Sequence, residues 1–565
     1  MENKGMRISS FSPREPQARV NRNSNIHTYG EYMLRTQLFS TSNSIIGEQG
    51  MVATSQPLAA QAGLDILKQG GNAIDAAIAT AACMTVVEPT CCGMGGDAFA
   101  IIHTQDGLYG INGSGTAPLS ISIEALKDRG YEEMPLMGWC PITVPGIPKT
   151  WASLSKRFGS MSLKQVLEPA IQHARNGYHV TPSIAKAWER TYHIYNNKAE
   201  KADYAEWYRV YAPQGRVPKA GELWASLDHA STLQEIGDTQ AESFYRGRLA
   251  REISKASLDA GGYLSYEDLA NYEIKWVSPL YQTYHGYDIW ELPPNGQGVI
   301  ALVALNILEH CDIKMEEKEE WTHQQIEAIK CAFAMASREI VDPSDVNQER
   351  LDYLLSSDFA LSCAATITEK AVEYSPLSLP EGGTVYLCTA DNAGNMVSYI
   401  QSNYYGFGSG IVIPGTGITM QNRGYDFKFE ESHPNVLQAG KRPYHTIMPG
   451  FLTKQGEAIG PFGIMGGYMQ PQAHVQVMLH LIDGMMSPQD ILDTPRFRWV
   501  QGLKVEVEPE YSASINNKLL SRGHEVTVSE DIDAFGRGQM ILRDPISGRY
   551  IGGTERRVDG MVAAY

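Results

Sequence analysis

Two glycines that lead into a threonine, Gly382-Gly383-Thr384, constrain this chain more than any other feature. Thr384 opens an alternating run that predicts a β-strand, residues 391–395 supply a turn, and residues 396–400 predict the returning strand. As local structure this is a hairpin with a glycine-rich entry, and most such hairpins are scaffold. The functional interpretation is that cleavage of the Gly383–Thr384 bond makes Thr384 a new N-terminus. Its hydroxyl would then be a nucleophile and its own α-amine the base.

Length and charge exclude several classes of protein. The chain has 565 residues, enough for a large buried core, and its net charge is −17 with no run of Lys or Arg. Because nucleic-acid binding draws on clustered cations, we expect no nucleic-acid partner. No segment reaches the roughly 18–20 apolar residues that span a bilayer, so we expect no membrane association and a cytoplasmic protein.

Cysteine and histidine spacing predicts neither disulfides nor a metal. Eight cysteines are too few for a disulfide framework in a chain of this length, and Cys91-Cys92 is adjacent rather than CxxC. No His, Cys and Asp cluster has the spacing of metal ligands. We therefore expect reduced thiols, no metal and no cofactor.

Two helices are predicted before the first glycine-rich segment. Ser55 is a candidate N-cap with Pro57 in the first turn, and Asn72 with Asp75 predicts a capping box. The helix over residues 73–87 is apolar nearly all round, so it must be buried. The segment Gly93-Met94-Gly95-Gly96-Asp97 lacks the Lys-Ser/Thr of a phosphate loop, and tight backbone packing explains it better.

A second glycine pair follows a predicted strand. Residues 458–464 predict a strand, Gly466-Gly467 comes next, and a helix is expected to start at Pro471. Backbone N–H groups near a helix start lack partners, so two of them can receive a developing oxyanion. The alternative is a tight strand-to-helix turn, and the pattern alone leaves both open.

Short motifs spread over most of the chain resemble the γ-glutamyltranspeptidase family, from about residue 50 to the C-terminus. The motifs are Gly70-Gly71-Asn72-Ala73-Ile74-Asp75-Ala76-Ala77, Glu88-Pro89, Gly95-Gly96-Asp97, Val144-Pro145-Gly146, Pro293-Pro294-Asn295-Gly296, Gly383-Thr384, Gly394-Asn395-Met396-Val397-Ser398, Pro434-Asn435-Val436, Lys441-Arg442-Pro443, Gly466-Gly467 and Thr494-Pro495-Arg496-Phe497. Each is weak alone, but their joint order is specific.

The resemblance implies an α+β fold, the four-layer αββα sandwich of N-terminal-nucleophile hydrolases. The precursor would cleave itself between Gly383 and Thr384 into subunits that stay together. We then expect an irregular arm over residues 1–46, a large subunit over 47–383 and a small catalytic subunit over 384–565, both in one continuous fold. The cut leaves 383 residues before it and 182 after it.

The resemblance also implies the catalytic roles. Thr384 would attack the Gly383 carbonyl during maturation and a substrate amide afterwards. Gly466 and Gly467 would hold the oxyanion, and Ser402 stands where the family has a second threonine that hydrogen-bonds the nucleophile. An α-amine with a pKa of about 7.7–8.0 is partly neutral near pH 7 and can take the proton.

Substrate-binding positions depart from the family. Ser114 stands at an arginine position, Tyr404 replaces an amide side chain, and Arg423 stands where glutamine is usual, while Asp426 is kept. His445 and Thr446 replace paired serines; we interpret His445 as a hydrogen-bonding wall rather than an acid–base catalyst. One cationic anchor is lost and another gained, so an acidic substrate fits in a different orientation. Only residues 437–440 separate Val436 from Lys441, where the family's transpeptidases carry a longer lid, so the resemblance implies a lid-less and more open site.

These residues predict a γ-glutamyltranspeptidase-like hydrolase or acyltransferase, with glutathione-type chemistry the most economical reading. The acyl-enzyme would be resolved by water or an amine, and the cleaved heterodimer is expected to form a homo-oligomer. One alternative is a hydrolase of another small amide, of oxamate or glutaryl type. Another is an uncleaved binding protein without catalysis.

Overall fold

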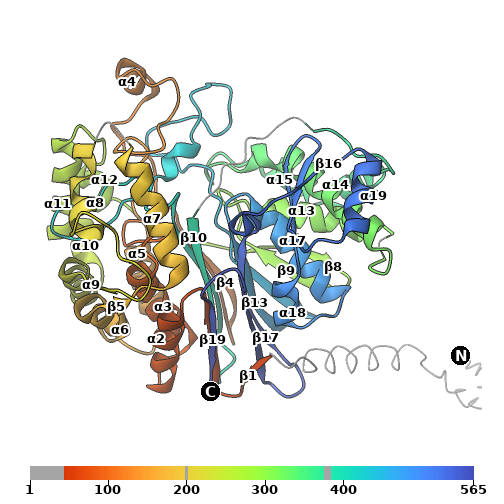
Figure 1. Ribbon diagram of the computed structural model, residues 1–565, viewed down its shortest axis with the longest axis horizontal. Helices are drawn as coiled ribbons and strands as arrows, with labels where there is room; N and C mark the ends of the chain where they lie inside the picture. Colours follow the sequence, from red (N-terminus) through yellow and green to blue (C-terminus); the bar gives the residue numbers. More distant parts are fainter. Residues whose placement is uncertain (1–43, 198–200, 313, 375–382) are drawn as a thin grey trace, which may run out of the picture.

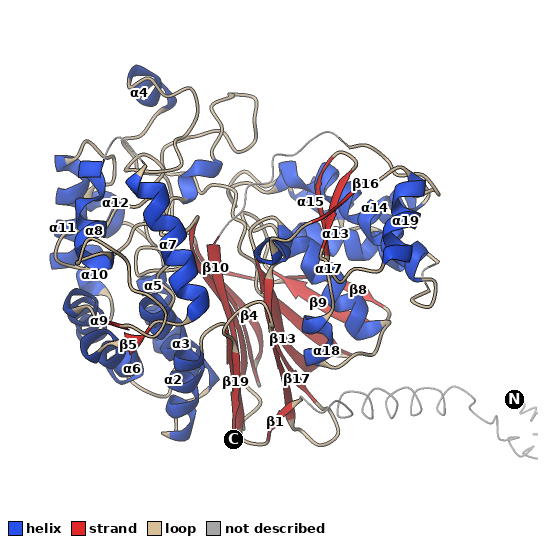
Figure 2. Ribbon diagram, viewed as in Figure 1, coloured by secondary structure: helices blue, strands red, loops and turns tan. Residues whose placement is uncertain are grey.

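Two large antiparallel sheets lie face to face in the computed structural model, which describes residues 44–197, 201–312, 314–374 and 383–565 (Figure 1). One sheet has the strand order β1-β18-β17-β13-β12-β9-β8 and the other β19-β2-β10-β11-β3-β4-β7. Helices cover the outer face of each sheet (Figure 2). This arrangement confirms the predicted αββα sandwich.

In the first sheet four neighbouring strands, β18, β17, β13 and β12, follow Thr384, and β1, β9 and β8 precede it. Its strands are β1 (Ile45–Gly47), β18 (Tyr550–Thr554), β17 (Arg537–Arg543), β13 (Glu457–Met465), β12 (Gly450–Lys454), β9 (Tyr287–Glu291) and β8 (Leu280–Tyr284).

In the second sheet three strands, β19, β10 and β11, come from Gly383 onward, and the other four precede it. Its strands are β19 (Met561–Ala564), β2 (Gly50–Thr54), β10 (Gly383–Asp391), β11 (Met396–Tyr404), β3 (Asp97–Thr104), β4 (Gly107–Gly113) and β7 (Lys275–Val277). Two small sheets complete the described strands: β5 (Tyr178–His179) with β6 (Leu223–Trp224), and β14 (Phe497–Gln501) with β15 (Lys504–Val507) and β16 (Glu525–Val528).

The helices form two groups (Figure 1). Those beside the second sheet are α2 (Pro57–Lys68), α3 (Ala73–Val87), α4 (Ile123–Asp128), α5 (Ile147–Phe158), α6 (Leu163–Asn176), α7 (Pro182–Asn196), α8 (Ala205–Tyr211), α9 (Leu227–Thr239), α10 (Glu242–Arg246), α11 (Arg248–Asp259) and α12 (Tyr266–Ala270). Those beside the first sheet are α13 (Gly298–Glu309), α14 (Lys318–Ala336), α15 (Gln348–Leu354), α16 (Ser357–Ala364), α17 (Met469–Ile482), α18 (Pro488–Asp493) and α19 (Ala513–Arg522).

The apolar helix α3 is buried along its whole length, as its sequence predicts, and packs on β10 and β11. Asn72 Oδ1 accepts hydrogen bonds from the backbone N–H groups of Ile74 and Asp75, and the Asp75 carboxylate accepts one from the backbone N–H of Asn72. The predicted capping box is therefore confirmed. An apolar surface on every side suits a helix packed between the sheet and α2 and α6.

The predicted cap of the preceding helix is wrong. Helix α2 has Gln56 as its N-cap, without a side-chain cap bond. The Ser55 hydroxyl instead donates to Glu88, 2.7 Å away. The hydroxyl thus satisfies a buried carboxylate far along the chain, a tertiary contact that the local pattern does not show.

Strand β10 lies between β2 and β11, with α3 on one side and β13 of the other sheet on the other. Every residue of it after Gly383 is buried, because both of its faces are covered. Its register with β11 shifts between Gly383 and Val385, so Thr384 lies at an irregularity at the start of the strand. Such irregularities re-aim a side chain next to an active site.

The N-terminal arm, predicted over residues 1–46, ends before residue 46. Ile45 and Ile46 already belong to β1, paired with β18. The rest of the predicted arm, residues 1–43, and most of the extended lead-in to Thr384, residues 375–382, lie outside the described residues. Among the described helices, none is both long and apolar enough to cross a bilayer.

Candidate active site

The hydroxyl of Ser402 joins the predicted nucleophile to the bond that precedes it. Thr384 Oγ1 donates to Ser402 Oγ at 3.2 Å, and Ser402 Oγ donates to the Gly383 carbonyl oxygen at 2.7 Å. The backbone N–H of Tyr404 donates to the same hydroxyl at 2.7 Å. Thr384 and Ser402 are each only 1% exposed. The serine thus holds the attacking hydroxyl and the carbonyl at one point.

The pair Gly466-Gly467 lies between the end of β13 and the start of α17, which begins at Met469 rather than at Pro471. Gly466 has φ +142° and Gly467 has φ +59°, values that favour glycine. Gln297 Nε2 donates to the Gly467 carbonyl at 2.9 Å and holds the turn in place. Gly466 and Gly383 line the same cavity, so the predicted oxyanion donors and the predicted cleavage site share one cleft.

Arg423 and Asp426 lie in a buried polar compartment with Tyr404 and Thr446. Arg423 Nη1 donates to Thr446 Oγ1 at 2.9 Å and lies 3.5 Å from Asp426 Oδ2, while its guanidinium covers the Tyr404 ring at 4.0 Å. Tyr404 donates to Asp426 Oδ1 at 2.9 Å, and burial raises the pKa of both side chains. Arg423 Nε and Nη2 are buried without a hydrogen-bond partner, as is Asp426 Oδ2. The compartment therefore offers unused donors to an acidic group.

His445 pairs with Asp97, the first residue of β3. The register partner of Asp97 on the neighbouring strand β11 is Ser402. The backbone N–H of Ile447 donates to His445 Nδ1, so Nε2 carries the proton and donates to Asp97 Oδ2 at 3.1 Å. Burial lowers the pKa of His445 well below its usual value, with Arg423 acting in the same direction. Burial also raises the pKa of Asp97 to about 7. Sequence reasoning did not place Asp97 in the site, although it ends a motif that carried the resemblance.

Ser114 lies in a buried network rather than on the wall of the cleft. Its hydroxyl donates to Asn112 Oδ1 at 2.7 Å and accepts from Asn295 Nδ2 at 3.2 Å. Its carbonyl accepts from Arg442 Nε at 3.1 Å. The structure thus brings Ser402 to Thr384, places Gly383 and Gly466 in the lining of one cleft, and groups Arg423 with Asp426. Contact between Ser114 and a substrate stays a prediction.

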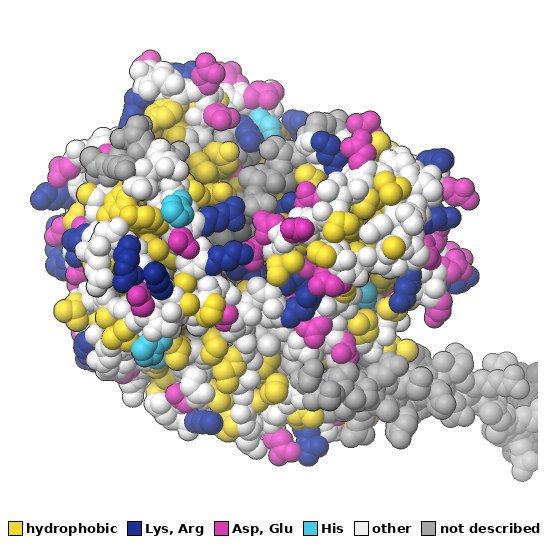
Figure 3. Space-filling model, viewed as in Figure 1, with side chains coloured by type: hydrophobic (Ala, Val, Ile, Leu, Met, Phe, Trp, Pro, Cys, Tyr) yellow, Lys and Arg dark blue, Asp and Glu magenta, His cyan; other side chains and the backbone are white. Residues whose placement is uncertain are grey.

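The cleft that Gly383 and Gly466 line has a volume of about 660 Å³. Lys186 and Arg190 of α7 belong to its lining, and so do Glu530 and Asp531, which precede η4 (Ile532–Phe535). Figure 3 shows Lys and Arg side chains and Asp and Glu side chains gathered on either side of the middle of this face. The walls of the cleft therefore carry charges of both signs.

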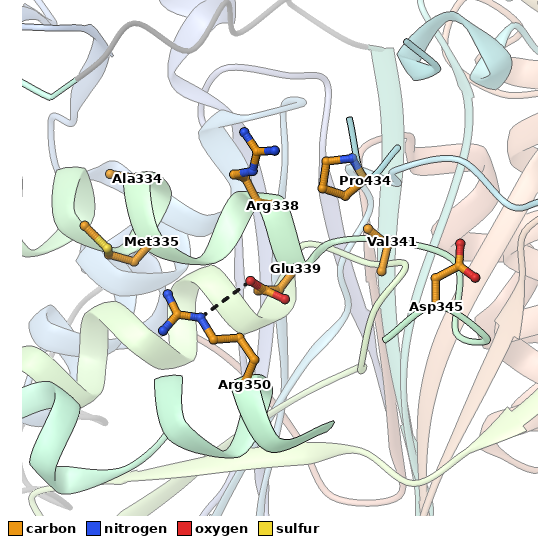
Figure 4. A pocket seen from close by; sticks show the side chains of 8 residues that line it. All are labelled: Ala334, Met335, Arg338, Glu339, Val341, Asp345, Arg350 and Pro434. Carbon is orange, nitrogen blue, oxygen red and sulfur yellow. Dashed lines mark ion pairs between the residues drawn. The ribbon is translucent and has the colours of Figure 1, made fainter. Parts of the chain in front are cut away.

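A second hollow of about 430 Å³ lies between α14 and the short connection that starts at Pro434 (Figure 4). Arg350 Nε faces Glu339 Oε1 at 3.6 Å across it. Lys441, at the end of that connection, pairs with Asp345 at 2.8 Å. Its lining contains none of the predicted catalytic residues, so we assign it no part in the chemistry.

One buried cluster could hold a metal: His323, Glu327 and His524, whose ligand atoms lie within 4.8 Å of one another. Sequence spacing missed it because about 200 residues separate the two histidines. Lys330 Nζ lies 2.6 Å from Glu327 Oε1, and the N–H of Val372 donates to the other carboxylate oxygen. A lysine ammonium on the carboxylate opposes a second cation, so the cluster fits a hydrogen-bonded network better than a metal centre.

The fold and the enzyme class agree: this is a threonine-dependent N-terminal-nucleophile amidohydrolase, made as a proenzyme that cleaves itself. The model of the gamma-glutamyltranspeptidase family matches residues 59–565, and the chain belongs to that family. Membership among hydrolase proenzymes removes the alternative of an uncleaved binding protein.

Three relatives illustrate the range within the family. The glutathione hydrolase-like YwrD proenzyme of Bacillus subtilis is 34% identical over 92% of this chain and 99% of its own length. The oxamate amidohydrolase proenzyme of Klebsiella pneumoniae is 30% identical over 93% of this chain and all of its own. The crystal structure of cephalosporin acylase from Bacillus halodurans superposes with a TM-score of 0.90 at 51% identity, covering 93% of this chain and 97% of that one.

Proposed function

We propose that Thr384 is the nucleophile of an amide hydrolase that removes a small acidic acyl group, with γ-glutamyl as one candidate. Maturation starts when the Thr384 hydroxyl attacks the Gly383 carbonyl carbon, and the resulting ester is hydrolysed by water. The freed α-amine then takes the hydroxyl proton during attack on a substrate amide. Gly466 and Gly467 N–H groups receive the oxyanion, and one such donor is worth about 10²- to 10³-fold in rate.

The observation that carries this proposal is the position of Ser402, 3.2 Å from the Thr384 hydroxyl and 2.7 Å from the Gly383 carbonyl oxygen. One hydroxyl that orients both the nucleophile and the carbonyl serves precursor cleavage first. After the cut it remains beside the nucleophile. The proposal includes the assembly of the cleaved heterodimer into a homo-oligomer.

An acidic acyl group is supported by the unused donors of Arg423 in the buried compartment. A guanidinium whose Nε and Nη2 donors are both free suits a carboxylate, which it binds through two parallel hydrogen bonds. A second candidate substrate is an amide of oxamate or glutaryl type. The loss of the family's arginine at Ser114 favours it, because the α-carboxylate anchor of a γ-glutamyl group is then missing.

The test begins with the purified protein on a denaturing gel. Wild type is expected to give pieces of 383 and 182 residues, the smaller starting Thr-Val-Tyr-Leu-Cys by N-terminal sequencing. Thr384→Ala should give one full-length chain, and Thr384→Ser, which keeps a hydroxyl, should still cleave. A small piece that starts at another residue, or cleavage in Thr384→Ala, would contradict the proposal.

Cleaved wild type is then assayed with γ-glutamyl, glutaryl and oxamic anilides. We expect kcat/KM for the preferred acyl group to fall about 10- to 100-fold in Arg423→Gln, because a charge-assisted hydrogen bond contributes about 1.5–3 kcal/mol. Turnover of the glutaryl or oxamic compound without the γ-glutamyl one selects the second candidate.

A further inference from the structure

Arg537 stands beside the glycine turn, on a different segment of the chain from Arg423. It is the first residue of β17, and its register partner on β13 is Met465, the residue before Gly466. Arg537 also lines the 660 Å³ cleft together with Gly383 and Gly466. A cation is therefore built into the open cleft next to the predicted oxyanion donors.

The guanidinium of Arg537 has no partner among the described residues. Its Nε is buried without a hydrogen bond, and no described carboxylate lies within 4.0 Å of it. Glu88, Asp533 and Glu555 attract it from a greater distance, and the Cys91 thiol faces it as well. A buried donor that makes no hydrogen bond costs free energy, so the presence of unpaired Arg537 in the cleft needs an explanation.

Two of the carboxylates that attract Arg537 have partners of their own, while the third, Asp533, lines the same cleft beyond ion-pair distance. Glu88 accepts from Ser55, and Glu555 is held by Arg496 at 2.9 Å and by Arg557. Arg557, another arginine of the cleft lining, is fixed by Glu508 and Glu555. Arg557 is therefore structural, whereas Arg537 keeps its donors for a molecule in the cleft.

Arg423 and Arg537 lie in two different parts of the site. Arg423 is 1% exposed and lies in the closed compartment with Asp426, whereas Arg537 lies in the open cleft. An amide bound with its carbonyl at the glycine turn extends on both sides of that carbonyl. The proposed function places the small acyl group beside Arg423, so the amine portion occupies the cleft.

We propose that Arg537 binds a carboxylate on the amine portion of the substrate, so that the preferred leaving groups are amines that carry a carboxylate near the scissile nitrogen. This rests on the proposed function for the direction in which the amide lies. A guanidinium binds such a carboxylate with two parallel hydrogen bonds and holds the amide nitrogen over the nucleophile. The same contact retains the free amine after the acyl group has been transferred to Thr384.

The test compares two anilides that share the acyl group wild type hydrolyses and differ only by a ring carboxylate, 4-nitroanilide and 3-carboxy-4-nitroanilide. The ratio of kcat/KM, carboxylated over plain, is expected to fall about 10- to 100-fold in Arg537→Gln and to recover in part in Arg537→Lys. Complete self-cleavage of each variant, judged on a denaturing gel, reports that it folds.

Lys186→Gln is the matched control, because it removes one positive charge from the opposite wall of the same cleft. We expect it to change the ratio by less than about 3-fold. An unchanged ratio in Arg537→Gln would overturn the proposal. An equal fall of the ratio in Lys186→Gln would also overturn it, because the carboxylate would then respond to the overall positive charge of the cleft and not to a direct bond with Arg537.

Binding of the free amine separates this proposal from the proposed function. Calorimetric titration of 3-aminobenzoate into cleaved wild type needs no turnover, and we expect its affinity to fall about 10-fold or more in Arg537→Gln. If wild type hydrolyses none of the acyl series but binds 3-aminobenzoate through Arg537, the proposed acyl group is wrong and the Arg537 site stands. Equal affinity in wild type and Arg537→Gln overturns the Arg537 site alone.

Discussion

At the scale of single residues, the site is built from polar groups whose positions along the chain are far apart. Ser402 and Asp97 face each other across two neighbouring strands, and His445 reaches Asp97 from another segment. Each of these side chains is at most 1% exposed. Buried polar groups that bond one another fix the geometry around Thr384, because leaving any one unpaired costs about 1–3 kcal/mol.

The Asp97–His445 pair gives the protein a pH-dependent stability. Folded Asp97 has a pKa of about 7, above its ordinary 3.8, so between these values the folded state keeps a proton that the unfolded chain releases. Its contribution is therefore lost as pH rises from about 4 to about 7. The lowered pKa of His445 has the opposite effect on stability: below pH 6.5 the unfolded chain takes up a proton that folded His445 does not, so stability rises as the pH rises toward 6.5.

Asp97→Asn removes only the first of these two effects. Relative to wild type, the variant should gain up to about 4 kcal/mol in free energy of unfolding between pH 4 and pH 8, at about 1.36 kcal/mol per pKa unit. Urea unfolding at several pH values measures this difference, with Asp106→Asn on an exposed turn as the control. A difference that does not change with pH would show that Asp97 is ionised throughout.

At the scale of elements, the hairpin that follows Gly383 is predictable because its alternation and its turn are local. The capping box of α3 is predictable for the same reason. The cap of α2 is not, because Ser55 bonds Glu88, a residue 33 positions away. The start of α17 at Met469 likewise depends on how Gly466 turns against β17, which no local pattern specifies.

Asn72→Ala tests the element that supports β10 from the helical side. Asn72 accepts from two N–H groups at the start of α3 and donates to the Phe158 carbonyl at 2.7 Å. Losing these bonds should lower the free energy of unfolding by about 1–2 kcal/mol, measured as a shift in the urea midpoint. Asn72→Asp keeps the acceptor and should lose less; an equal loss in both variants would mean that the contact with Phe158 dominates.

At the scale of the whole molecule, the predicted cut runs through both sheets. In one sheet β10 and β11 lie between β2 and β3. In the other, β1 on one side and β9 with β8 on the other flank strands from after Thr384. A cut before Thr384 therefore leaves each piece with unpaired strands. Among the described strands, five pairings of the two large sheets join the pieces: β1–β18 and β12–β9 in one sheet, and β19–β2, β10–β2 and β11–β3 in the other.

We expect the two pieces, residues up to 383 and from 384 onward, to elute together after cleavage and to separate only in denaturant. Uncleaved Thr384→Ala should elute at the same volume, since the cut changes no strand order. Residues 384–565 expressed alone should be insoluble, because their strands lack neighbours. A soluble, folded small piece would contradict the interleaved arrangement.

The sequence by itself determined the local features: the hairpin at Thr384, the buried helix over residues 73–87, and the order of motifs that resembles one family. Turns, caps and alternation act over a few residues, so they can be seen in the sequence. Only the tertiary structure decided what surrounds Thr384: the Ser402 bond to Gly383, the Asp97–His445 pair, the closed compartment of Arg423 and the unpaired Arg537. These contacts join segments up to about 350 positions apart, where burial and charge, rather than local pattern, select the partner.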